Sequence, residues 1–95
     1  IDDAFIRRFQ SMIYFKMPSW PERLKLWINA FNGEVTLESK VDLKEIAKKY
    51  ELAGGAIVNV LKYCAIKAVQ RNSKVVLNND LLSGIKYELL KEGKV

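Results

Sequence analysis

Apolar residues recur at helical spacing along most of this chain, and that periodicity constrains the fold more than any other feature. The clearest stripe follows the spacing i, i+3, i+4 and i+7 and consists of Leu24, Trp27, Ile28 and Phe31. Ser19 and Glu22 before it have the capping-box spacing, and Asn32-Gly33 after it supplies a helix stop. The sequence therefore predicts a helix that begins at Ser19 and ends near Gly33.

Two further helices follow from the same signals. Asp42 and Glu45 repeat the cap spacing before an apolar run, so we expect a shorter helix over about 43 to 51, with residues 34–41 as a connecting loop. The Gly54-Gly55 step opens a long third helix that should end near Asn72-Ser73. Its apolar stripe consists of Ile57, Val60, Leu61, Cys64, Ala65 and Ala68.

The last third of the chain predicts one short extended piece and a fourth helix. Residues 75–77 are apolar and briefly extended, and Asn79-Asp80 then provides a helix cap. The residues expected to face inward before the stop at Gly93 are Leu82, Ile85 and Leu89. Four helices with short connections should pack as a small bundle.

The first 17 residues have a different pattern. Residues 2–8 read as a short helical turn with acids at its start, and residues 12–15 form a compact apolar run typical of a buried strand. One strand cannot satisfy its own backbone groups, so its partners are expected outside this chain. The predicted fold class is thus all-α: a four-helix bundle preceded by a helical turn and one strand that pairs outside this chain.

Composition excludes several kinds of chemistry. The 95 residues contain no histidine and one cysteine, Cys64, so imidazole catalysis, a histidine-ligated metal and a zinc cluster are excluded, and we predict no metal site. Cys64 lies on an apolar stripe and is expected to be an inert core thiol. No apolar run is long enough to span a bilayer and no secretion signal opens the chain, so we expect a cytoplasmic protein without a membrane partner.

The net charge of +5 leaves a nucleic-acid partner open. The lysines are spread along the whole chain, which is more typical of solvated faces than of a binding groove. A basic helical module that binds nucleic acid, or a helical interaction domain that never meets nucleotide, are therefore the alternatives to the interpretation given next.

Four segments together resemble the end of the AAA+ ATPase module. Residues 1–9 (IDDAFIRRF) are similar to the end of its second region of homology, and residues 18–26 (PSWPERLKL) to the opening of the first lid helix. Residues 41–47 (VDLKEIA) with 52–57 (LAGGAI) resemble a third family motif. The resemblance implies that residues 1–17 belong to the edge of the large domain and that residues 18–95 form the helical lid.

That resemblance implies a function as well as a fold. The lid would close over ATP or ADP with Mg²⁺, and would couple nucleotide binding and hydrolysis to subunit movement in a homo-oligomeric ring. Its partners would be the large domain, which is expected outside this chain, and the neighbouring subunits. The phosphate-binding loop and the paired acids that organise magnesium are absent from the sequence, so the chain by itself is expected not to hydrolyse ATP.

The resemblance also assigns roles to particular residues. Arg7 and Arg8 occupy the positions of arginine fingers that act on the neighbouring subunit's nucleotide, for which a guanidinium is well suited. Gly54 and Gly55 would let the third helix approach adenine closely. Two lower-ranked base contacts are Leu26 and Ala30.

From the residues alone, each of these assignments has a simpler alternative. The arginines could be solvated charges, the glycines a turn into a helix, and the apolar pair plain core. At Val58 some family members carry a phosphate-sensing arginine, so this helix is expected to contact the base rather than phosphate.

Overall fold

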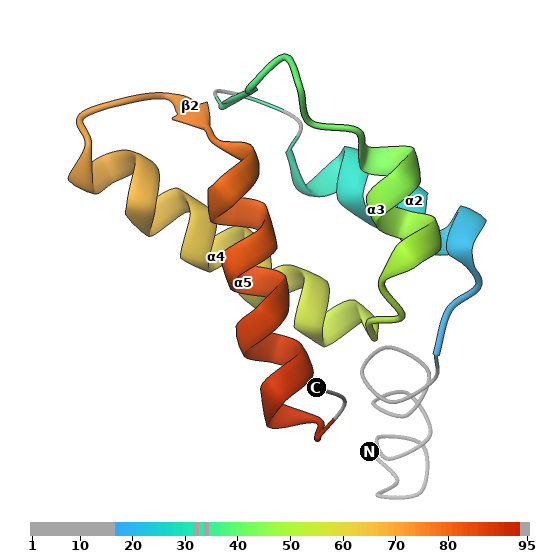
Figure 1. Cartoon of the computed structure of the whole chain (residues 1–95). Helices are drawn as coiled ribbons and strands as arrows, with labels where there is room; N and C mark the ends of the chain where they lie inside the picture. The colour runs from blue at the N-terminus through green and yellow to red at the C-terminus, as the bar shows by residue number, and fades with distance from the viewer. Residues whose placement is uncertain (1–16, 32, 34, 94–95) are drawn as a thin grey trace, which may run out of the picture.

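The computed structural model describes residues 17–31, 33 and 35–93 and shows a mostly helical domain (Figure 1). The predicted helical turn over residues 2–8 and the strand over residues 12–15 lie outside the described residues. Within the described part, the elements in chain order are α2 (Trp20–Ala30), β1 (Thr36–Leu37), α3 (Leu43–Lys49), α4 (Gly54–Gln70), β2 (Val75–Val76) and α5 (Asn78–Lys91).

The four helices form two packed pairs that share one core. α2 packs mainly on α3, and α4 packs mainly on α5, while α2 also contacts α4 (Figure 1). The prediction of four helices is confirmed for the described residues, which also contain a small parallel sheet of two strands that was not predicted. The core between the pairs is made of fully or nearly fully buried side chains, the largest of which are Trp27, Leu52, Ile57, Leu81 and Ile85.

Helix α2 begins where the capping box predicts. The Glu22 carboxylate accepts hydrogen bonds from both the backbone N–H and the hydroxyl of Ser19, each at 2.9 Å. Trp27 and Phe31 are buried and their rings stack at 6.2 Å between centroids. Ile28 was expected on the same buried stripe, but its side chain is 53% exposed, because the buried face of α2 is narrower than the sequence pattern.

Helices α3 and α4 also match their predicted limits closely. The Asp42 carboxylate accepts a hydrogen bond of 3.2 Å from the backbone N–H of Glu45, as a helix cap should. α4 runs from Gly54 to Gln70, and Asn72 then adopts a left-handed φ of 53°, which ends the helix at the predicted place. Ala65, which the predicted stripe included, is exposed.

The prediction for α5 was wrong at two points: the helix begins before the predicted cap, and Leu81 rather than Leu82 faces the core. The helix begins at Asn78, and Asp80 is its third residue rather than its cap. Asp80 instead accepts a hydrogen bond of 3.0 Å from the backbone N–H of Leu77. In this arrangement Leu81 is fully buried, whereas Leu82, which was expected to face the core, is exposed.

The segment predicted as a loop contains a strand. β1 pairs in parallel with β2, with Thr36 opposite Val75 and Leu37 opposite Val76. A strand of two residues is too short to show the alternation of apolar and polar side chains that marks strands in a sequence. Directly after β1, the Glu38 carboxylate accepts a hydrogen bond of 2.9 Å from the backbone N–H of Asn78, which joins β1 to the start of α5.

Candidate functional site

The residues predicted to face a nucleotide lie on two helices. Gly54 and Gly55 are the first two residues of α4, and both are partly buried. On α2, Leu26 is exposed, and Ala30, the last residue of the helix, is partly buried and packs against the core. The predicted arginine fingers, Arg7 and Arg8, lie outside the described residues.

The first turn of α4 differs chemically from the first turns of the other three described helices. Its cap residue is Ala53, whose side chain cannot accept a hydrogen bond, and its first turn contains no acid. α2, α3 and α5 instead have Glu22, Glu45 and Asp80 in the first turn. Because a helix N-terminus carries partial positive charge and free backbone N–H groups, the start of α4 suits an electron-rich ligand better than the other helix starts do.

Arg23 fixes the elements that lead into α4. Its side chain is buried, its Nε donates to the Ala47 carbonyl at 2.8 Å, and a terminal nitrogen donates to the Pro18 carbonyl at 2.7 Å. Arg23 therefore connects the segment before α2 to the last turn of α3, which ends at Lys49 shortly before the start of α4. The family resemblance includes this arginine, but its spacing on α2, four residues before buried Trp27, is what could have indicated a buried role.

An ion pair between the exposed Arg71 and the buried Asp80 closes the connection from α4 to α5. Arg71 donates to both carboxylate oxygens of Asp80, at 3.1 and 2.7 Å, and also to the Val75 carbonyl at 3.1 Å. Burial would raise the pKa of Asp80, but the hydrogen bonds from Arg71 and from the Leu77 N–H, together with the arginine charge, lower it. The hydrogen bond to Asp80 in turn raises the pKa of Arg71. Both groups stay charged at neutral pH.

At the opposite end of the α4–α5 pair, Glu88 is buried between two donors. Asn59 of α4 donates an amide hydrogen bond to it at 3.0 Å, and Lys91 of α5 approaches it at 2.7 Å. Val58, at the position where some AAA+ proteins have a phosphate sensor, is exposed on α4. On α4, the neighbouring residue Asn59 is therefore the one that makes a polar contact, and this contact joins α4 to Glu88 of α5.

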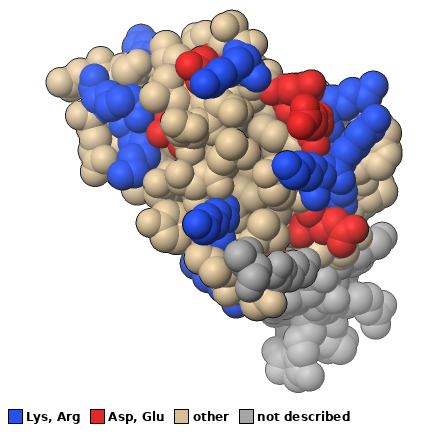
Figure 2. All heavy atoms as spheres, in the orientation of Figure 1, with Lys and Arg blue, Asp and Glu red and all other residues tan. Residues whose placement is uncertain are grey.

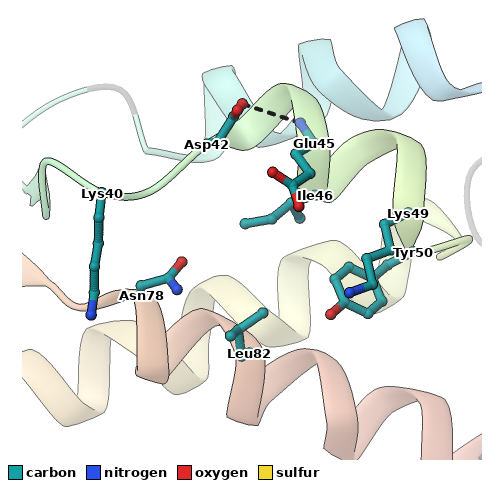
Figure 3. Close-up of a pocket in the computed structure, with 8 residues that line it drawn as sticks. All are labelled: Lys40, Asp42, Glu45, Ile46, Lys49, Tyr50, Asn78 and Leu82. Carbon is teal, nitrogen blue, oxygen red and sulfur yellow. Dashed lines mark hydrogen bonds between the residues drawn. The ribbon is translucent and has the colours of Figure 1, made fainter.

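A small hollow lies between α3 and the start of α5 (Figure 3). Its volume is about 160 Å³, below the several hundred cubic ångströms of most ligand pockets. Ile46 of α3 and Leu82 of α5 approach it from two sides, and the side chains of opposite charge around it are Lys40, Lys49, Asp42 and Glu45. Balanced charge and small size do not suit a nucleotide, and none of the predicted nucleotide-facing residues lines this hollow.

Cys64 is fully buried on α4, as predicted for a core thiol. Burial, with a smaller contribution from the negative charge of Asp80, raises the pKa of its thiol to about 12. The thiol is therefore protonated at neutral pH and is not a nucleophile. The described residues contain no group of histidine, cysteine and acidic side chains that could hold a metal ion.

The charged side chains on the face shown in Figure 2 are interleaved. Lysines and arginines lie over both ends of the molecule, and acidic side chains lie among them (Figure 2).

None of the helices in the described part of the chain combines the length and the apolar character that crossing a membrane requires. No protein-family model matches this sequence, and a search of curated proteins finds no match.

Proposed function

We propose that this chain is the helical lid of an AAA+ ATPase, with residues 1–17 belonging to the edge of the large domain. The lid would close over ATP or ADP with Mg²⁺ and couple its hydrolysis to the movement of subunits in a homo-oligomeric ring. The sequence resemblance supports this proposal, because each of the lid motifs lies at the start of a described helix: residues 18–26 at α2, residues 41–47 at α3, and residues 52–57 at α4.

The observation that carries the proposal is that α4 begins with two glycines and has neither a side-chain cap nor an acid in its first turn. Two glycines stand directly after an alanine cap, so no side chain larger than a methyl group shields the backbone there. The core residues Leu52 and Ile57 anchor the segment on both sides. A helix start that has no side-chain cap and is held by buried residues on both sides is suited to close contact with a flat, electron-rich ring such as adenine.

Substitution of the glycines tests this role in the full-length protein. Gly54→Val and Gly55→Val, made separately, should weaken ATP binding about tenfold, because the new side chains block the backbone approach. Ala65→Val is the matched control, since Ala65 is exposed on the same helix about three turns away. Calorimetric titration with ATP measures the effect. Unchanged affinity in both glycine variants, with the helical content retained, would contradict the assignment.

The finger assignment is tested by turnover rather than by binding. Arg7→Ala and Arg8→Ala, made separately in the full-length protein, should leave ATP binding and assembly intact while one of them lowers ATP turnover at least a hundredfold. Normal turnover in both variants would show that neither arginine acts on the nucleotide.

The distribution of charge argues against the alternative of a nucleic-acid module. The face shown in Figure 2 has basic and acidic side chains among one another, and the hollow beside α3 has both signs around it. A nucleic-acid groove requires a continuous basic track, commonly with aromatic side chains on which bases stack.

A further inference from the structure

The outer face of the α4–α5 pair contains a groove that is independent of the nucleotide role proposed above. Each helix contributes four residues at the spacing i, i+3, i+4 and i+7, so one continuous stripe of each helix faces the groove. The lining residues are Asn59, Lys62, Tyr63 and Ile66 from α4, and Gly84, Tyr87, Glu88 and Lys91 from α5. The volume of about 360 Å³ is more than twice that of the hollow beside α3.

The middle of the groove has aromatic and apolar side chains beside a close contact between the two helices. Gly84 has no side chain there, and a methyl group at this position would lie 3.0 Å from Val60 and 3.2 Å from Tyr63. Tyr63 and Tyr87 flank it with ring centroids 5.6 Å apart. Ile66 is 58% exposed and Tyr87 is 56% exposed. Ile66 and Tyr87 thus leave apolar surface in the same groove that a partner could cover.

The α4–α5 pair carries most of the excess positive charge of the chain. Residues 54–91 contain six basic residues and two acidic ones, a net charge of +4, so the rest of the chain contributes only +1. Both acids are already engaged, Asp80 with Arg71 and Glu88 with Lys91. Lys62 has no carboxylate within salt-bridge distance among the described residues.

We propose that this groove binds an acidic amphipathic helix of a partner protein. Two helical stripes with an apolar centre offer the same surface that a third helix of a bundle packs on. Apolar side chains of the partner would lie over Gly84 between Ile66 and Tyr87, and its acids would face Lys62 and the lysines around the groove. A nucleic-acid strand fits less well, because the charged residues that line the groove, Lys62, Lys91 and Glu88, do not form the continuous basic track that a phosphate backbone requires.

A designed peptide serves as the probe. It is about 18 residues long, enough for a helix to form on binding, with leucines at i, i+3, i+4 and i+7 and glutamates on the flanking positions. Fluorescence anisotropy of the labelled peptide with the full 95-residue chain should show saturable binding that weakens as salt is added. A peptide of the same composition in scrambled order, and one with lysine for every glutamate, should bind at least about tenfold more weakly.

Two pairs of variants locate the binding site. Ile66→Ser should weaken binding about tenfold, whereas Ile28→Ser, an isoleucine of similar exposure on α2, should leave it within about twofold. Lys62→Glu should weaken binding about fivefold, whereas Lys44→Glu on α3 should not. All four positions are exposed, and circular dichroism checks that the fold is retained.

Three results would overturn the proposal. The first is equal affinity for the ordered and scrambled peptides, which would indicate unspecific charge attraction. The second is equal loss in the test and control variants. The third is tighter, Lys62-dependent binding of a single-stranded oligonucleotide than of the peptide, which would assign the groove to nucleic acid.

Discussion

At the scale of single residues, buried charges determine how the helices are joined. Arg23 connects the end of α3 to the segment before α2, and Arg71 with Asp80 closes the turn from α4 to α5. The buried groups among these, Arg23 and Asp80, have hydrogen-bond partners that compensate for their loss of water. Removing one member of such a set leaves the others unpaired, so single substitutions here should have large effects.

Arg23→Met tests the first connection. Methionine keeps much of the apolar stem but loses both hydrogen bonds to the Pro18 and Ala47 carbonyls, so the free energy of unfolding should fall by about 2 kcal/mol. In a domain of this size that corresponds to a fall in the melting temperature of about 8 to 16 °C. Lys25→Met, at an exposed position of the same helix, should change stability by less than about 0.5 kcal/mol. Equal stability of the two variants would contradict this role.

Asp80 gives the fold a defined pH dependence. Its pKa is lowered in the folded chain, so its contribution to stability is present above the unfolded pKa of about 3.9 and is lost as the pH falls through the lower folded pKa. Asp80→Asn should therefore destabilise the chain by about 2 kcal/mol at pH 7, and the difference from the wild type should shrink below about pH 4.

Urea unfolding of both proteins across this pH range measures the difference in free energy. Glu45→Gln, which removes an exposed acid on α3, is the control and should show a smaller effect. A difference for Asp80→Asn that is constant from pH 7 to pH 3 would mean that the carboxylate charge is not what stabilises this turn.

At the scale of helices and strands, the sequence predicted what depends on local signals. The cap at Asp42 and the glycine pair at 54 and 55 indicated where α3 and α4 begin, because caps and glycines act on the backbone next to them. β1 could not be predicted, since its pairing with β2 depends on residues almost 40 positions away. The start of α5 was misplaced for a related reason: Asp80 resembles a cap, but it is held by Arg71 and lies inside the helix.

The candidate sites divide in the same way. Gly54 and Gly55 could be selected from the sequence, because the family motif contains them. The groove between α4 and α5 could not, since Gly84 and Ile66 become neighbours only after the two helices pack. The four groove residues on each helix do follow the spacing i, i+3, i+4 and i+7. That spacing alone does not indicate a groove, because the residues on any one face of a helix share it.

Gly84→Ala tests the close packing of α5 on α4. The added methyl group would lie 3.0 Å from the fully buried Val60, which has little room to move, so overpacking should outweigh the better helix propensity of alanine. We expect a net loss of about 1 kcal/mol in the free energy of unfolding. Ser83→Ala at the preceding position should change it by less than about 0.5 kcal/mol. A gain in stability for Gly84→Ala would show that the helices are not in close contact there.

At the scale of the whole molecule, the two helix pairs present different surfaces. The start of α4 has no side-chain cap, while the outer face of α4 and α5 has a groove lined by apolar and aromatic side chains and by Lys62. A lid that contacts nucleotide at one place and a partner helix at another could respond to both.

ATP affinity, measured by calorimetry on the 95-residue chain and on the full-length protein under the same conditions, tests the lid assignment most directly. We predict no measurable binding to the chain alone, because the phosphate-binding loop is absent from its sequence, and micromolar or tighter binding to the full-length protein. Micromolar binding of ATP to the chain alone, or no binding to the full-length protein, would contradict the assignment.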